Sequence, residues 1–377
     1  MKFIHLSDLH IGLHLHELSM LEEQRAILWQ ILDIVDREHP DGVLIAGDVY
    51  DKTVPSAEAV GLFDGFLSEL AQRGTRTFVI SGNHDSPERI AFGSRIMQAG
   101  GIHLSPVYSG AVEPIRMTDA HGAVNVYLLP FLKPMHVRRF FPDAQIDSYT
   151  DAVRVAIQAM KLDPSERNLL VAHQFVTGTG NGESVTVGGT DNVDASVFAD
   201  FDYVALGHIH SATPDTTKRI RYCGTPLRYS FSEMRDEKTV TVAELGSKGD
   251  LTLRTVPLTP LHGMRELRGE FDRLIQKDFY EGTTLSTDYL RIILTDENEI
   301  PNAMGRLRSI YTNLLYLDYD NTRTRALAQI AAPEALAQRS PLELFAQFYE
   351  KQNGAPMSAE QEDFMAQLIE KLKEVEA

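Results

Sequence analysis

The chain has 377 residues, of which 43% are hydrophobic and 24% charged, and its formal net charge is -17. This length predicts two or three domains, and the composition excludes collagen-like, disordered and disulfide-rich proteins. The negative charge opposes unaided binding to nucleic acid, because that affinity draws on Lys and Arg side chains. A DNA substrate would therefore need compensation from metal ions, local basic patches or a second subunit.

The cysteine content and the N-terminus bear on the cellular compartment. The single cysteine, Cys223, excludes an intramolecular disulfide and a thiolate metal cage, which favours a reducing compartment. Lys2, His5, Asp8 and His10 leave no uninterrupted apolar run for a signal peptide. No later stretch approaches the roughly 20 apolar residues that span a bilayer. We therefore expect a cytoplasmic protein.

Short aliphatic runs alternate with helical patterns in the first half of the chain. Apolar residues at three- and four-residue spacing predict helices over residues 20–38 and 56–73. Strands are predicted over Lys2–Leu6, Gly42–Ala46, Arg76–Ile80, 124–129, 168–172, 203–206, 219–223, Thr239–Leu245 and 251–256. The alternation predicts an α/β layered domain, which we place at residues 1–260 because Pro257 and Pro260 break the pattern.

The rest of the chain predicts two smaller parts. Residues 261–330 are expected to form an α+β domain, with helices at 270–277 and 303–312 and strands at 288–294 and 314–318. Residues 331–377 are expected to form two helices, because Ser340-Pro341-Leu342-Glu343 and the Ser358/Gln361 pair are N-terminal capping signals. Their apolar stripes are Leu342, Phe345 and Tyr349, and Phe364, Leu368 and Leu372. The stripes fit either a partner surface or an internal core.

Five polar clusters carry the chemistry, and each follows a strand-like run. They are Asp8-Leu9-His10, Gly47-Asp48, Gly82-Asn83-His84-Asp85, His173 and Gly207-His208-Ile209-His210. Ligands at successive strand ends converge on one point in space. Carboxylate, imidazole and amide oxygen suit Mn, Fe or Zn.

The spacing within the clusters predicts a pair of cations. In an extended segment, Asp8 and His10 point the same way, as do His208 and His210, so each pair can grip a metal ion. Asp48 is placed to bridge two ions, which would clamp the phosphate oxygens and activate water for an in-line displacement. His84, beside Asn83, is the expected proton donor to the leaving alkoxide.

In this order, the five clusters resemble the calcineurin-like metallophosphoesterases. Within that superfamily the chain is similar to the bacterial SbcD family of nuclease subunits over nearly its whole length. The narrower match lies in residues 3–10, Tyr222-Cys223-Gly224-Thr225-Pro226, Ser230-Phe231-Ser232-Glu233 and the segment 340–345.

The resemblance implies a four-layer α/β/β/α sandwich with a small α+β capping domain and a C-terminal helical pair. It implies one metal ion at Asp8, His10, Asp48 and His210, another at Asp48, Asn83, His173 and His208, and His84 as the catalytic acid or phosphate stabiliser. One departure is Asp51, which stands where archaeal and eukaryotic relatives have a histidine.

The same resemblance implies the activity and the assembly. It implies a Mn-dependent double-strand exonuclease and single-strand or hairpin endonuclease, acting in DNA repair, recombination and replication. It further implies a homodimer of nuclease subunits within a heterotetramer, with an SbcC-type coiled-coil ATPase bound by the C-terminal helices.

Two rival interpretations stay open from the residues alone. A small-molecule or protein phosphoesterase would use the same dinuclear site, because a fold and its metals do not fix the substrate. The other rival is a scaffold protein that binds metal only for stability. The intact His84 and the full ligand set argue against this interpretation.

Arg89 fits a phosphate contact and an ion pair equally well.

Overall fold

The computed structural model describes residues 1–178, 191–212, 219–322 and 324, with scattered tail positions between 342 and 369. The chain divides into two compact units, one of residues 1–266, 280–291 and 308–316, the other of residues 267–279, 292–307 and 317–377. Domain boundaries at residues 260 and 330 remain predictions. In the described part, no helix has the length and hydropathy to cross a membrane.

Two mixed sheets form the first unit. The larger has the order β15-β14-β1-β4-β5-β6. Strands β1, β4, β5 and β6 are parallel to one another, whereas β14 is antiparallel to both of its neighbours, β1 and β15. Its strands are β1 (Lys2–Leu6), β4 (Gly42–Ala46), β5 (Arg76–Ile80), β6 (Ile102–Leu104), β14 (Thr239–Leu245) and β15 (Leu251–Pro257). The expected strands at these positions are confirmed, and β6 was not predicted.

The second sheet has the order β13-β12-β9-β8-β7, and all its neighbours are parallel except β7 and β8. Its strands are β7 (Ile115–Asp119), β8 (Gly122–Leu129), β9 (Arg167–His173), β12 (Tyr203–Gly207) and β13 (Ile220–Tyr222). Two small ribbons pair β2 (His14–Leu15) with β3 (Leu18–Ser19), and β10 (Phe175–Thr177) with β11 (Asn192–Asp194).

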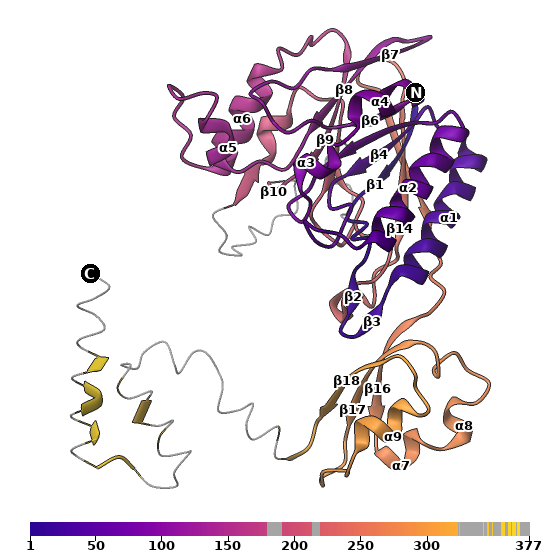
Figure 1. The fold of residues 1–377 in the computed structure, drawn as a ribbon, viewed down its shortest axis with the longest axis vertical. Coiled ribbons are helices and arrows are strands. Elements are labelled where there is room, and N and C mark those ends of the chain that lie inside the picture. The colour runs from indigo at the N-terminus through magenta and orange to yellow at the C-terminus, as the bar shows by residue number, and fades with distance from the viewer. Residues whose placement is uncertain are drawn as a thin grey trace. The chain divides into compact units, whose positions relative to one another are not determined.

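Side-chain alternation along the strands builds four layers. In β4, Val43 and Ile45 pack toward α1 (Leu21–Glu38) and α2 (Ala57–Gln72), whereas Leu44 and Ala46 face the second sheet. The outer face of the second sheet is covered by α5 (Pro134–Arg138) and α6 (Tyr149–Ala159). Figure 1 shows these two helix pairs on opposite sides of the sheets. The expected α/β/β/α sandwich is confirmed.

Local capping explains where α2 and α6 begin, whereas α1 starts without a side-chain cap. Ser56 accepts the backbone N–H of Ala59 at 3.2 Å before α2, and Ser148 forms a capping box with Asp151 before α6. Shorter helical segments are α3 (Pro87–Ile90), α4 (Ser94–Met97), η1 (Gln98–Gly100), η2 (Ala195–Phe198) and η3 (Phe231–Glu233).

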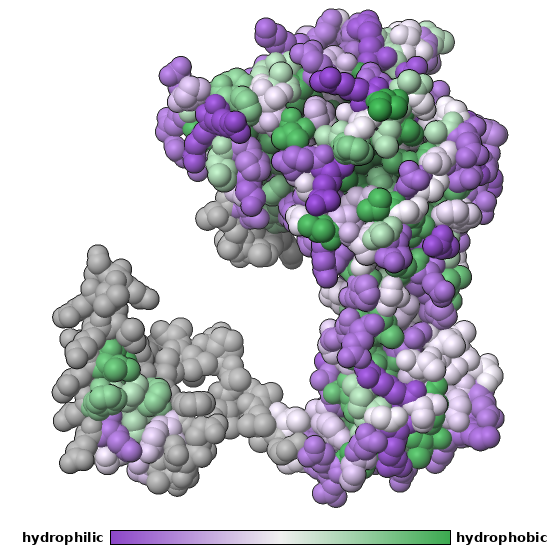
Figure 2. Space-filling model, viewed as in Figure 1, coloured by the Kyte–Doolittle hydropathy of each residue, from purple (hydrophilic) through white to green (hydrophobic). Residues whose placement is uncertain are grey.

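On the face drawn in Figure 2, polar side chains of this unit surround isolated apolar ones.

A three-stranded sheet, β16-β17-β18, supplies the extra C-terminal sheet. Its strands are β16 (Met264–Gly269), β17 (Tyr289–Leu294) and β18 (Leu314–Tyr319), and its helices α7 (Phe271–Leu274), α8 (Lys277–Tyr280) and α9 (Ala303–Arg308). The continuous helix predicted over 270–277 is wrong, because the chain forms two separate single turns there. The predicted helix over 303–312 ends early, at Arg308, where the chain turns back to bury Tyr311 before β18.

The predicted tail helices fall largely outside the described residues. Ser340, Pro341, Glu343, Gly354 and Leu372 are among those outside. The described positions Leu342, Phe345, Tyr349, Phe364 and Leu368 are helical.

Candidate metal centre

The five polar clusters lie together at the carboxyl edges of the parallel strands. In the first sheet, β1, β4 and β5 end just before Asp8, Asp48 and Asn83. In the second sheet, β9 ends at His173 and β12 ends directly before His208. Because neighbouring parallel strands point the same way, their ends share one edge and their loops converge.

Two groups of acceptor atoms share Asp48. In the first group, Asp8, His10 and His210 offer ligand atoms within 4.8 Å of one another, and Nε2 of His10 lies 3.2 Å from Nε2 of His210. Oδ2 of Asp48 lies 3.8 Å from Nε2 of His10. The first group therefore comprises Asp8, His10, Asp48 and His210.

A second group forms around Oδ1 of Asn83. Oδ1 of Asn83 lies 3.0 Å from Nε2 of His173 and 3.0 Å from Nδ1 of His208. Oδ2 of Asp48 lies 3.3 Å from Nε2 of His173. All seven expected ligands thus lie in these two groups, and Asp48 contacts a histidine in each.

The chemistry of these atoms fits cations. Nδ1 of His173 donates to the carbonyl of Ala46 at 2.8 Å, and its Nε2 lies 3.3 Å from the Asp48 carboxylate, where either a proton or a cation favours the contact. The Nε2 atoms of His10 and His210 also face each other, 3.2 Å apart. Lone pairs this close repel unless a proton or a metal ion lies between them, and imidazole with carboxylate and amide oxygen is a donor set for divalent transition metals.

Burial and charge set the protonation of the groups. Burial alone would lower the pKa of His173, but the hydrogen bond with Asp48 and its negative charge raise that pKa to about 9. His173 in turn outweighs burial at Asp48 and holds the pKa of that carboxyl well below its usual range. Burial lowers the pKa of His10 to about 3 and of His208 to about 4, which favours the neutral imidazoles that bind metals.

Strained backbone accompanies the site. Asp8, His10, Asp48 and His208 have φ values of 52°, 43°, 49° and 102°. Side chains other than glycine rarely adopt this region, and such residues cluster at functional sites. Glycine is required by close approach at Gly82, where a Cβ would collide with the Asp48 carboxylate.

Three residues to which the sequence analysis assigned no role hold the loops. Asp85 accepts backbone N–H groups from Gly82, Val49 and Tyr50 at 2.9 to 3.1 Å, which ties two ligand loops together. Gln24 donates to the carbonyl of His10 at 2.8 Å, and Tyr229 to that of Leu9 at 2.6 Å. Asp85 stands in a recognised motif, but no sequence signal points to Gln24 or Tyr229.

His84 lies at the rim of the centre. Its ring centroid is 4.9 Å from that of His10, and Nδ1 donates to the backbone carbonyl of Asp51 at 2.9 Å. This hydrogen bond leaves Nε2 as the free position. His84 also lies within ligand distance of His10 and Asp48, so geometry alone permits a ligand role. Arg89 is exposed, and none of the ion pairs among the described residues includes it.

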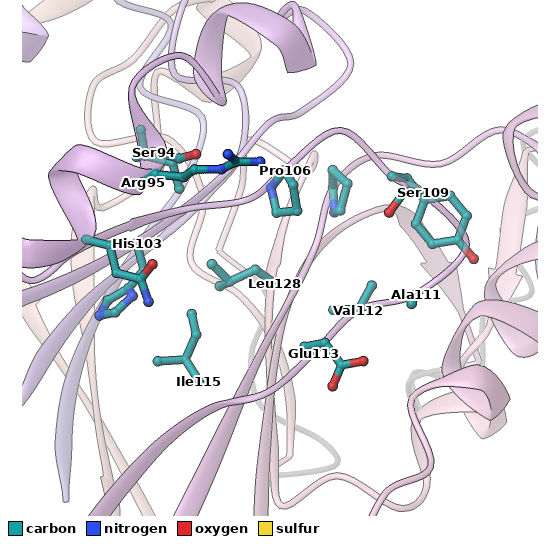
Figure 3. A pocket seen from close by; sticks show the side chains of 14 residues that line it. Ser94, Arg95, His103, Pro106, Ser109, Ala111, Val112, Glu113, Ile115 and Leu128 are labelled. Atoms are coloured by element: carbon teal, nitrogen blue, oxygen red, sulfur yellow. The ribbon is translucent and has the colours of Figure 1, made fainter.

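A separate cavity of about 390 Å³ lies between α4, β6 and the start of β7. Figure 3 shows Leu128, Ile115 and Val112 among its apolar lining, with Arg95 and Glu113 also at the cavity. None of the residues in the two ligand groups lines it.

Comparisons with known proteins show the family of the chain. Residues 1–212 match the calcineurin-like phosphoesterase family, and residues 260–353 match the family described as type 5 capsule protein repressor C-terminal domain. The SbcD component of the SbcCD nuclease of Staphylococcus epidermidis is 32% identical over 84% of this chain and 85% of its own length. Its counterpart from Staphylococcus saprophyticus is 30% identical over 84% of each chain. A solved structure from Thermus thermophilus aligns at 10% identity and a TM-score of 0.38 over 67% of this chain and 98% of that chain.

Proposed function

This chain belongs to the calcineurin-like phosphoesterases and, within them, to the SbcD nuclease subunits, and we propose that it hydrolyses DNA phosphodiester bonds with two divalent cations. The single observation that supports this most is the pair of acceptor groups sharing Asp48. We propose double-strand exonuclease and single-strand or hairpin endonuclease action, in DNA repair, recombination and replication in the cytoplasm.

We propose that the first group holds one ion and the second group the other. Mn is the metal we favour, because the family resemblance implies it and these mixed nitrogen and oxygen ligands suit it, together with Fe and Zn. When bound, two such ions supply Lewis-acid stabilisation of charge on phosphate oxygens and an activated water. The chain's own contribution is to hold the acceptor atoms in place through Asp85, Gln24 and Tyr229.

His84 is proposed to protonate the leaving oxygen or stabilise the phosphate. The Asp51 carbonyl fixes Nδ1 as a donor, so Nε2 is the atom that would hold and transfer the proton. Exposure of His84 at the rim gives that atom access to substrate. The contribution of Asp51 here comes from its main chain, so the missing histidine at this position does not remove it.

The proposed partner is an SbcC-type coiled-coil ATPase, bound by residues 331–377. Phe345, Tyr349, Met357 and Phe364 line one hollow of about 270 Å³ in the tail, and Phe364 is 64% exposed. Aromatic side chains in a concave apolar surface are typical of a protein interface. Such a partner would also bring DNA affinity to an acidic nuclease.

We propose that two nuclease subunits pair within the heterotetramer. Phe92 and Ile96, next to and within α4, are each 81% exposed. Large apolar side chains so fully in water are typical of an association surface. The domains proposed are 1–260 for the nuclease, 261–330 for the cap and 331–377 for partner binding.

The deciding experiment compares a linear DNA duplex with a small chromogenic phosphodiester, each with and without Mn²⁺. The purified chain with its ATPase partner should degrade the duplex only with the metal. Hydrolysis of the small diester alone, with the duplex untouched, would favour the rival small-molecule phosphoesterase. Two bound ions with no hydrolysis of either substrate would favour the scaffold.

A further inference from the structure

A buried ion pair lies beneath His210, and the proposed chemistry does not use it. The side chains of Glu233 and Lys238 are only 4% and 5% exposed, and Nζ of Lys238 lies 2.6 Å from Oε2 of Glu233. Removing two charges from water is costly, and apolar side chains of similar volume often stabilise a core as well. The position of this pair, rather than its stability, therefore needs an explanation.

Glu233 reaches the imidazole of the candidate ligand. Nδ1 of His210 donates to Oε1 of Glu233 over 3.4 Å, and Ser230 donates to the same oxygen at 3.0 Å. Thr225 donates to Oε2 at 2.9 Å. Lys238 donates to Oε2 at 2.6 Å as well. The carboxylate thus accepts from four side chains and holds its orientation toward His210 through them.

Lys238 holds the main chain of the same residue. Its Nζ donates to the carbonyl oxygen of His210 at 3.1 Å, and to Thr225 Oγ1 at 2.8 Å. The backbone N–H of Thr225 donates to the same His210 carbonyl at 3.0 Å. The ion pair therefore fixes His210 at both its ring and its backbone.

The hydrogen bond to Glu233 selects the tautomer that faces the first group. With Nδ1–H donating to Glu233, the neutral ring keeps its lone pair on Nε2, which faces His10. The other imidazole of that group has no such support, because Nδ1 of His10 is buried without a hydrogen-bond partner among the described residues. Of the two histidines in the first group, His210 is therefore the one whose ring is oriented by a hydrogen bond at Nδ1.

We propose that Glu233 is a positioning residue for the first of the two metal ions, acting through Nδ1 of His210, and that Lys238 holds the carboxylate for this task. The inference rests on the proposed dinuclear function and assigns a role to residues outside the seven ligands. Outer-shell partners of metal-ligating histidines typically change affinity by about 10- to 100-fold. The effect should fall on one ion, because the contacts of Glu233 among the described residues include His210 but not Asn83, His173 or His208.

The test measures Mn²⁺ binding to the full chain by calorimetry and by electron paramagnetic resonance. Glu233→Gln should weaken one of two Mn²⁺ ions by about 10- to 100-fold. At limiting Mn²⁺ the spin-coupled pair signal should give way to that of isolated Mn²⁺. Glu237→Gln is the matched control, because it removes the same charge from an exposed neighbour; both ions should bind as in the wild type.

A second variant covers a folding defect, because Glu233→Gln removes the nearer carboxylate partner of the buried Lys238 and leaves Asp236 at 3.6 Å from Nζ. Glu233→Gln with Lys238→Met removes both charges together, and the same one-ion loss is expected. Two wild-type affinities in either folded variant would overturn the inference, as would equal weakening of both ions. Failure of the wild type itself to bind two ions would overturn the proposed function, and this inference with it.

Discussion

Asp48 joins the two groups of candidate ligands, and it does so from a backbone conformation that its side chain alone would not favour. Oδ1 accepts the backbone N–H of His84 at 2.8 Å, while Oδ2 faces His10 and His173. Its φ of 49° lies in the left-handed region. A strained residue of this kind persists only where its surroundings determine it, so its geometry should survive an isosteric substitution.

Asp48→Asn should therefore lower metal occupancy and hydrolysis together. The amide keeps the shape but removes the charge that would serve both ions. Elemental analysis for bound metal and a nuclease assay on the same preparation check this. Asp64→Asn, on the exposed face of α2, removes the same charge and should change neither; two retained ions with near-normal cleavage by Asp48→Asn would contradict the bridging role.

His84→Gln should separate binding from turnover. General acid catalysis typically contributes about 10² to 10⁴ in rate, so hydrolysis should fall by that factor while calorimetry shows two Mn²⁺ ions still bound. His84 also lies within ligand distance of His10 and Asp48. A collapse of metal affinity in this variant would assign His84 to the ligands instead.

At the scale of elements, one arginine joins the two sheets. Arg167 begins β9 with a side chain 3% exposed, and it pairs with Asp119 of β7. Its Nη1 also donates to the carbonyls of Leu245 and Gly246 at 3.2 and 2.7 Å, at the end of β14. A buried cation with these partners holds the strand ends in register across the sandwich.

Arg167→Met should lower the free energy of unfolding by about 1 to 3 kcal/mol, because the carbonyls of Gly122 and Gly246 lose the Arg167 donor. Asp119 keeps the N-terminal ammonium and the backbone N–H of His121 as donors. Urea denaturation measures this change. Arg154→Met is the control. The Arg154 side chain, which pairs with Asp151, is 46% exposed, so the free energy of unfolding should fall by about 0.5 kcal/mol or less. Equal effects of the two substitutions would show that Arg167 contributes no more than a surface pair.

The same ion pair predicts a dependence on pH. The hydrogen bonds from Arg167 hold the pKa of Asp119 well below its usual range. The unfolded carboxyl titrates near about 3.9, so the stabilisation is complete above that pH and is lost as pH falls through the lower folded-state pKa. The stability difference between wild type and Arg167→Met should therefore shrink between about pH 5 and pH 2. A constant difference would exclude Asp119 as the titrating partner.

At the scale of the whole molecule, the sequence predicted what is local and missed what is long-range. The buried parallel strand β4 is a continuous apolar run, and β5 ends in one, Phe78 to Ile80. The ligand motifs follow these runs closely, so strands and motifs could both be predicted in order. The bond from Gln24 to Tyr229 spans 205 positions, and no sequence pattern connects Glu233 with His210. The sheet order, the positive φ values and these supporting contacts follow only from packing.

The two proposed associations of the chain can be separated by the same kind of substitution, phenylalanine to glutamate, on each of the two surfaces. Phe364→Glu puts a charge into the exposed apolar hollow of the tail, and Phe92→Glu does so beside α4. Phe364→Glu should abolish capture of the ATPase subunit while analytical ultracentrifugation still shows a nuclease dimer. Phe92→Glu should do the reverse, because the two surfaces share no residue. Each variant is thus the other's control for folding and for added charge.

Removal of residues 334 to 377 extends this argument to the whole tail. The seven candidate ligands all precede residue 260, so the truncated chain should fold, bind two ions and cleave a small or single-stranded diester. ATP-dependent action on duplex ends should be lost, because an acidic nuclease without its partner lacks the cations that hold DNA. If Phe364→Glu retains full ATPase binding while the truncation abolishes it, partner contact lies elsewhere in the tail and the aromatic hollow is internal packing.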